Sequence, residues 1–117
     1  MAIVLDYIKD AELFNKTAQD CVVRLSSSKP ETKSTQMRNF YEYVLDLYEK
    51  SKNEKNFDEI LPFVKMLNSK VAYAKSRGHI NDEFVSMIKE CVTQVTTAEQ
   101  LRVFKLFFEA VIGFSKK

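Results

Sequence analysis

The sequence contains very few of the residues that interrupt helices. Only two glycines and two prolines occur among its 117 residues. A sheet protein of this length needs many tight turns, which glycine and proline usually supply, so their scarcity favours a few long helices joined by short loops. Apolar residues make up 45% of the chain and charged residues 29%, which excludes a disordered protein and allows the chain to bury a core of its own. We therefore expect a single domain over residues 1–117.

The chain is also poor in residues that bind metal ions or react with substrates. Cys21 and Cys91 lie far apart with no CxxC pair, and His79 is the only histidine. We expect two reduced, mostly buried thiols and a histidine in a solvated turn. Acidic pairs such as Asp58-Glu59 lie at expected helix starts, where the helix dipole accounts for them. Because no glycine-rich phosphate loop or nucleophile elbow is present either, the sequence predicts a binding protein without metal or cofactor, and not an enzyme.

Long apolar runs are missing as well. The short run from Ala2 to Leu5 ends at Asp6, so we expect no signal peptide. No apolar run approaches the roughly 20 residues that a helix needs to cross a bilayer. The sequence therefore predicts a cytoplasmic protein that has no membrane partner.

Apolar residues recur at helical spacing in five segments. We expect a helix from about Leu5 to Ser26, one from Ser34 or Thr35 to about Lys52, one capped by Asn56 that ends at Arg77, one capped by Asn81 or Asp82 that reaches Val95, and one with a Thr96–Glu99 capping box that runs to Lys116 and Lys117. Pro62 falls within or just after the first turn of the third helix, where its missing N–H costs little. Gly78 is suited to a left-handed helix stop. The predicted fold class is all-α: a compact single-domain helical bundle of about five helices.

Positive charge is concentrated in the middle of the chain. The formal net charge is only +2, but residues 29–77 contain ten basic and seven acidic residues, whereas the rest of the chain contains eight and nine. On the third predicted helix, steps of three and four residues place one polar face of low relief opposite the apolar stripe. Its members are Lys65, Ser69, Ala72, Lys75 and Ser76. Small side chains between lysines would let a phosphate backbone approach closely.

Two helix ends add to this basic region. Lys33, Gln36 and Arg38 crowd the start of the second predicted helix, where free backbone amides and the helix dipole favour a phosphate. Arg77, at the far end of the third helix, offers a guanidinium for bidentate contacts. Charge and spacing alone leave two interpretations open, a surface that binds an RNA backbone and an ordinary solvated face. Backbone binding would depend strongly on salt and little on RNA sequence.

The tyrosines of this region divide between core and surface. Tyr48 lies with Phe40 on the predicted buried stripe, whereas Tyr41 and Tyr43 are expected to be more exposed. An exposed tyrosine could stack on a base or contact a protein partner. We expect Tyr73 in the core, with its hydroxyl at the rim.

Three motifs in this order resemble the small subunit of the type III-A (Csm) CRISPR interference complex. They are Thr35–Tyr41 (TQMRNFY), Asn56–Leu67 (NFDEILPFVKML) and Lys70–Arg77 (KVAYAKSR). The ending from Phe104 to Ile112 is also similar to that family, so the likeness covers roughly residues 35–114. The first predicted helix matches only in being helical and amphipathic.

The resemblance implies a non-catalytic helical bundle that is present in several copies and forms a filament along the guide RNA–target RNA duplex. Such subunits contact RNA without reading its sequence, and target cleavage belongs to a backbone subunit. The implied partners are guide RNA, target RNA, the backbone subunits, the large polymerase-like subunit and copies of the chain itself. The alternatives are the small subunit of the related type III-B (Cmr) complex and a helical protein–protein adaptor that binds no nucleic acid.

The resemblance also implies RNA contacts at individual positions. Matching positions are Gln36, Arg38, Lys65, Lys70 and Arg77, and the local charge adds Lys33 and Lys75. Lys70 lies nearer to the apolar stripe than Lys65. Its side chain could therefore extend along the surface or pair with a carboxylate instead.

Overall fold

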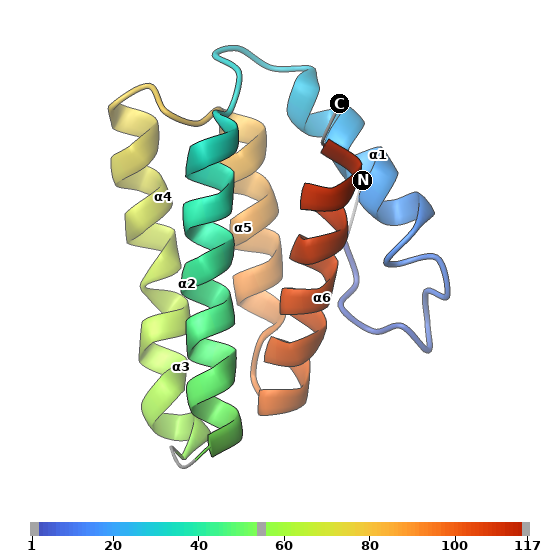
Figure 1. The fold of residues 1–117 in the computed structure, drawn as a ribbon, viewed down its shortest axis with the longest axis vertical. Coiled ribbons are helices and arrows are strands. Elements are labelled where there is room, and N and C mark those ends of the chain that lie inside the picture. The colour runs from blue at the N-terminus through green and yellow to red at the C-terminus, as the bar shows by residue number, and fades with distance from the viewer. Residues whose placement is uncertain (1–2, 54–55, 116–117) are drawn as a thin grey trace.

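The described part of the chain, which in this computed structural model comprises residues 3–53 and 56–115, contains six α-helices joined by turns and loops (Figure 1). They are α1 (Lys16–Ser26), α2 (Ser34–Asn53), α3 (Phe57–Lys65), α4 (Leu67–Ser76), α5 (Asp82–Gln94) and α6 (Ala98–Ser115). No strand occurs in the two described ranges, so the predicted all-α class is confirmed. Lys55, which belongs to the predicted basic region, and the predicted closing lysines at 116 and 117 lie outside the described residues.

The helices pack around one hydrophobic core. α2 packs against α6, α6 against α1, and α4 against α5, while α3 and α4 follow one another along the side of α2 (Figure 1). Phe108 lies fully buried at the centre and contacts rings from three helices. Its ring centroid is 5.7 Å from that of Tyr41, 6.1 Å from that of Phe84 and 6.0 Å from that of Phe104. This aromatic cluster joins α2, α5 and α6.

The first helix is shorter than predicted, because the chain before Lys16 forms irregular turns. The Asp6 carboxylate accepts hydrogen bonds from the backbone N–H groups of Ile8 and Lys9, and Asp10 in the same way accepts from Glu12. Short acidic side chains that capture nearby amides in this way compete with helical hydrogen bonding. The expected helix start at Leu5 was therefore wrong.

Residues 3–5 are held instead by a side chain at the end of α5, about 90 residues later in the sequence. The Gln94 amide on α5 accepts the Leu5 N–H at 2.8 Å and donates to the Ile3 carbonyl at 2.5 Å. Ile3 and Leu5 are both buried. The glutamine side chain thus satisfies backbone groups of Ile3 and Leu5 that would be bonded to a neighbouring strand in a sheet.

The third predicted helix is divided in two at Met66. Pro62 is the sixth residue of α3, beyond the first turn, so it removes a hydrogen bond that Asp58 would accept in a regular helix. The Met66 N–H still bonds to the Pro62 carbonyl at 3.1 Å, and α4 begins at the next residue. The expectation of one helix from Asn56 to Arg77 was wrong, and for this reason there are six described helices where five were predicted.

Three predicted helix ends are confirmed. Asn56 caps α3 and Asn81 caps α5, each through a side-chain oxygen that accepts a backbone N–H. Gly78 follows α4 with a φ of 77°. The N–H groups of Gly78 and His79 bond back to the carbonyls of Lys75 and Ala74, the pattern by which a left-handed residue ends a helix.

The predicted start of α2 at Ser34 or Thr35 is confirmed, but the caps of α2 and α6 differ from those predicted. α2 already begins at Ser34, so neither Ser34 nor Thr35 is its cap. Before α6 it is the Thr97 hydroxyl that accepts the Gln100 N–H, while the Gln100 side chain accepts the Thr96 N–H. The capping box therefore uses the next threonine and a glutamine, and the predicted pairing of Thr96 with Glu99 was wrong.

Candidate nucleic-acid interface

The seven residues predicted to contact RNA do not form one surface. Three line a groove between α2 and α4, two line a hollow beside α1, α2 and α6, and two are directed toward α5. The groove contains Gln36, Lys70 and Arg77. The hollow contains Lys33 and Arg38. The two residues directed toward α5 are Lys65 and Lys75. Gln36 and Arg38 separate because two residues along a helix differ by about 200° in direction.

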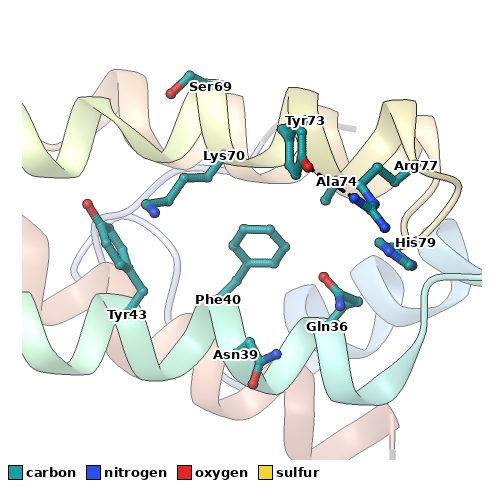
Figure 2. A pocket seen from close by; sticks show the side chains of 10 residues that line it. All are labelled: Gln36, Asn39, Phe40, Tyr43, Ser69, Lys70, Tyr73, Ala74, Arg77 and His79. Carbon is teal, nitrogen blue, oxygen red and sulfur yellow. Dashed lines mark hydrogen bonds between the residues drawn. The ribbon is translucent and has the colours of Figure 1, made fainter.

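The α2–α4 groove has a volume of about 570 Å³ and brings cations and aromatic rings together (Figure 2). Lys70 Nζ lies 5.0 Å from the centre of the Tyr43 ring, and Arg77 Cζ lies 5.8 Å from the centre of the Tyr73 ring. Arg77 also donates a hydrogen bond to the Tyr73 hydroxyl at 3.1 Å. The described residues that line the groove include no aspartate or glutamate. Both cations are therefore placed by tyrosines and keep their charge available.

The walls of the groove differ in character. Buried Phe40 lies between the two helices, and the amides of Gln36 and Asn39 project from α2 (Figure 2). The Tyr43 hydroxyl donates to the Phe63 carbonyl at 2.8 Å, which fixes that ring, and burial raises the pKa of Tyr43 above its ordinary value. The groove is thus lined by neutral donors and acceptors, two tyrosines and two positive charges.

Two residues of the groove were predicted differently. Tyr73 is 64% exposed rather than in the core, because Leu67, Val71 and Ala74 fill the buried side of α4. His79 is half-buried rather than solvated, and its Nδ1 is buried without a hydrogen-bond partner among the described residues.

The second hollow, of about 820 Å³, contains Lys33 and Arg38. Its lining is mixed, since it includes Glu31 and the half-exposed ring of Phe114. None of the ion pairs found between described residues involves Lys33 or Arg38. These two cations are therefore also available to an anion, on the opposite side of α2 from the groove.

Lys65 and Lys75 are exposed but already have partners on α5. Lys65 Nζ donates to the Val92 carbonyl at 3.3 Å, near the negative end of the α5 dipole. Lys75 pairs with Asp82 at 3.1 Å, and both side chains are too exposed for that pair to contribute much stability. The predicted polar face of low relief is present on the surface, but its two lysines are turned away from Lys70 and Arg77.

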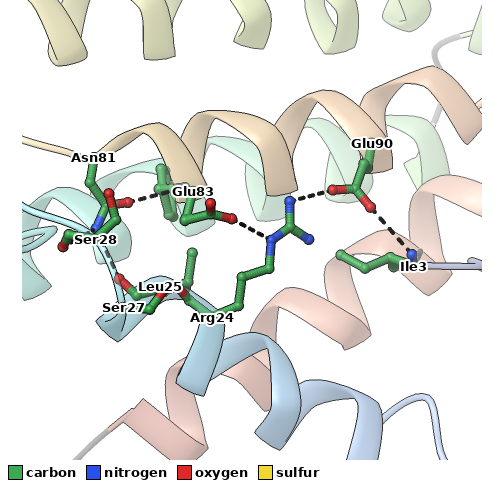
Figure 3. A network of polar contacts seen from close by, with 9 residues as sticks. Ile3, Arg24, Leu25, Ser27, Ser28, Asn81, Glu83 and Glu90 are labelled. Carbon is green, nitrogen blue, oxygen red and sulfur yellow. Dashed lines mark hydrogen bonds and ion pairs between the residues drawn. The ribbon is translucent and has the colours of Figure 1, made fainter. Parts of the chain in front are cut away.

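A polar network that the sequence did not reveal ties α1 to α5 (Figure 3). Arg24 donates to Glu83 at 2.6 Å and to Glu90 at 2.5 Å, and its side chain is only 17% exposed. Burial alone would lower the Arg24 pKa, but the hydrogen bonds to Glu90 and Glu83 outweigh it and raise the pKa above its ordinary value. Glu90 also accepts the Ile3 N–H. Because these charged side chains pair with one another across α1 and α5, we assign the network a structural role.

Both cysteines are free and buried, as predicted. Burial raises the pKa of Cys21 to about 12 and that of Cys91 well above its usual range. No group of three or more potential metal ligands occurs in the described ranges.

These buried thiols should be unreactive in the folded protein. At pH 8 we expect neither Cys21 nor Cys91 to react with Ellman's reagent within minutes, because the thiolate is the reactive form and both thiols are neutral and covered. In concentrated guanidinium chloride both should react at once. Rapid titration of one thiol in the folded state would contradict the burial described here.

Among residues 3–53 and 56–115, none of the helices has the length and apolar character required of a membrane span.

The chain is a small all-helical protein with a groove of tyrosines and cations between α2 and α4. The sequence model of the family Csm2 Type III-A matches residues 8–117, and the chain belongs to this family. It is thus a small subunit of a type III-A CRISPR complex, which confirms the resemblance and extends it through the first helix. Family membership implies assembly with the other subunits of the Csm complex. No curated protein and no solved structure matches the chain.

Proposed function

We propose that this subunit binds RNA backbone without sequence specificity, as a non-catalytic part of a filament along the guide RNA–target RNA duplex in the cytoplasm. The observation that carries the proposal is the α2–α4 groove, in which Lys70 and Arg77 rest on tyrosine rings and no lining carboxylate neutralises them. Cations held in this way can contact phosphates with little reorganisation. In this proposal residues 1–117 act as one domain.

We expect the other predicted RNA contacts to contribute unequally to RNA affinity. Lys33 and Arg38 would form a second anion-binding point, since no described carboxylate pairs with either. Lys65 and Lys75 are exposed, and an RNA phosphate would have to displace the Val92 carbonyl or Asp82. We therefore expect the groove to contribute more to RNA affinity than the side that faces α5.

A charge reversal in the groove tests the proposal. Lys70→Glu combined with Arg77→Glu should weaken the affinity for single-stranded RNA at least about tenfold at low salt, because two phosphate contacts are lost and repulsion replaces them. The slope of log affinity against log salt concentration should decrease in magnitude by about one for each substituted residue. Affinity is measured by fluorescence anisotropy at several salt concentrations, and co-purification of guide RNA with the assembled complex is the second readout.

The matched control reverses the same number of charges far from the groove. Helix α1 lies on the far side of the bundle from α4 (Figure 1); Lys16 is its first residue, Lys9 belongs to the turns before it, and both side chains are exposed. Lys9→Glu with Lys16→Glu should change RNA affinity by less than about threefold, since only the general field changes. Equal losses in both double variants would contradict a role for the groove. The circular dichroism spectra of all variants should match that of the natural protein.

A helical adaptor that binds no nucleic acid is the second candidate function. It is favoured by two large apolar side chains exposed near each other in sequence, Phe63 at 52% and Met66 at 47%. Side chains of this kind are typical of protein interfaces. If the natural protein bound no RNA at low salt and the complex retained its RNA without it, the adaptor would be the better assignment.

A further inference from the structure

We infer that the α2–α4 groove receives an unpaired nucleobase, stacked on the exposed ring of Tyr73, and not only the RNA backbone. This inference rests on the proposed RNA-binding function and specifies the form of RNA that the groove takes: a single-stranded segment or a base that has left its duplex. It assigns to Tyr73 a contact that neither charge nor spacing indicates.

Tyr73 is placed as a stacking platform. It is 64% exposed, although the burial of a tyrosine ring would normally stabilise a protein of this size. Arg77 donates a hydrogen bond to its hydroxyl at 3.1 Å, which holds the ring beside the groove (Figure 2). A base that stacked there would also meet the guanidinium, and stacking on aromatic and guanidinium groups is how proteins commonly hold single-stranded nucleic acid.

The opposite wall offers groups that can bond to the edge of a base. The side-chain amides of Gln36 and Asn39 line the groove from α2, and no hydrogen bond between described residues uses either amide. An amide presents both a donor and an acceptor, so it can pair with any base edge in some orientation. The hydrophobic floor at Phe40 and Ala74 would cover the remaining edge of a planar ring.

Charge and size agree with a nucleotide. Lys70 and Arg77 supply positive charge at separate points of the lining, and no described lining residue is acidic. The volume of about 570 Å³ lies within the range of about 300–1,000 Å³ that is typical of sites for small molecules. A base paired within a duplex cannot enter such a hollow, whereas an unpaired base can. An acidic peptide would suit the cations but would leave the tyrosine ring and the amides without a matching partner.

The test compares two RNA probes and two substitutions at one position in the full-length protein. The probes are a labelled 12-nucleotide uridine-rich strand and a fully paired RNA duplex of the same length. Tyr73→Ala should weaken single-strand binding by about 5- to 150-fold, which corresponds to the loss of one stacked base, and should change duplex binding by less than about threefold. Tyr73→Phe should retain most of the single-strand affinity, because stacking does not need the hydroxyl.

A structural control and a direct readout accompany these measurements. Phe63→Ala removes an aromatic ring that is also exposed on the α3–α4 side but does not line the groove, and it should leave both affinities unchanged. A strand containing 5-iodouridine should photo-crosslink to Tyr73, as located by mass spectrometry. Because the chain has no tryptophan, quenching of tyrosine fluorescence by the strand gives an independent signal that Tyr73→Phe should alter.

The outcomes separate this inference from the proposed function. If Tyr73→Ala left single-strand binding intact while the Lys70 and Arg77 reversals abolished it, the groove would bind backbone alone and the inference would be overturned. If poly-glutamate, added as a third probe, bound more weakly to the Lys70 and Arg77 reversals while RNA binding was unchanged by them and by Tyr73→Ala, the occupant would be an acidic peptide and the inference would be overturned. If the natural protein bound neither RNA probe at low salt, both the inference and the proposed function would fail.

Discussion

Replacing Phe108 with alanine should lower the free energy of unfolding by about 3–5 kcal/mol, the cost typical of removing a buried phenylalanine. Its ring is fully buried and lies within 5.7–6.1 Å of the rings of Tyr41, Phe84 and Phe104, measured between centroids. The substitution would remove the contact that joins α2, α5 and α6 and leave a cavity that these helices cannot close without moving. A loss of this size is a large fraction of the total stability of a domain.

The measurement is urea unfolding followed by circular dichroism, with the midpoint and slope fitted separately. Phe114→Ala is the matched control on the same helix, since that ring is 43% exposed and should cost less than about 1.5 kcal/mol. Similar losses from the two substitutions would show that Phe108 does not occupy the centre of the core.

Asn81→Ala should have the second largest effect, a loss of about 2–4 kcal/mol. The side chain is fully buried and does two things at once. Its oxygen accepts the Phe84 N–H at 2.9 Å and caps α5, while its nitrogen donates to the carbonyls of Leu25 at 2.9 Å and Ser28 at 3.2 Å (Figure 3). Loss of the cap costs about 1 kcal/mol, and a buried carbonyl left without a partner costs about 1–3 kcal/mol more.

A second substitution divides these two contributions. Asn81→Ser retains an oxygen that can cap α5 but loses both donations to the end of α1 and the loop after it, so its stability should lie between those of the natural protein and Asn81→Ala. Asp82→Ala, at the next residue, removes a highly exposed ion pair with Lys75 and a carboxylate in the first turn of α5, and should change the unfolding free energy by about 1 kcal/mol or less. Asn81→Ser and Asn81→Ala of equal stability would show that the cap contributes nothing.

Features encoded in a few consecutive residues could be predicted from the sequence. The helical stripes gave the fold class, and the caps at Asn56 and Asn81 and the stop at Gly78 follow from local backbone requirements. The irregular start of the chain was missed, although Asp6 and Asp10 carry the signal, since short acidic side chains favour turns over helix. Pro62 was recognised, but its distance from the helix start was underestimated.

The candidate site was predicted less completely, because it depends on which helix lies beside which. Lys70 and Lys75 are five residues apart, yet one reaches over Tyr43 of α2 and the other pairs with Asp82 of α5. The spacing of apolar residues along the sequence does not reveal which helix each face of α4 will contact. The exposure of Tyr73 has the same origin, since the ring is apolar enough for a core and only the packing of α4 decides its position.

The hydrogen bonds of the Gln94 side chain to residues 3–5 have a consequence for the order in which the chain folds. During synthesis on a ribosome, Ile3 and Leu5 are made long before Gln94, the last residue of α5, so these hydrogen bonds can form only after the whole of α5 has been translated. Closing a loop of this length also costs more chain entropy than closing the short loops between consecutive helices. Residues 3–5 can therefore dock on the bundle only after α5 has been made, although they precede every helix in the chain.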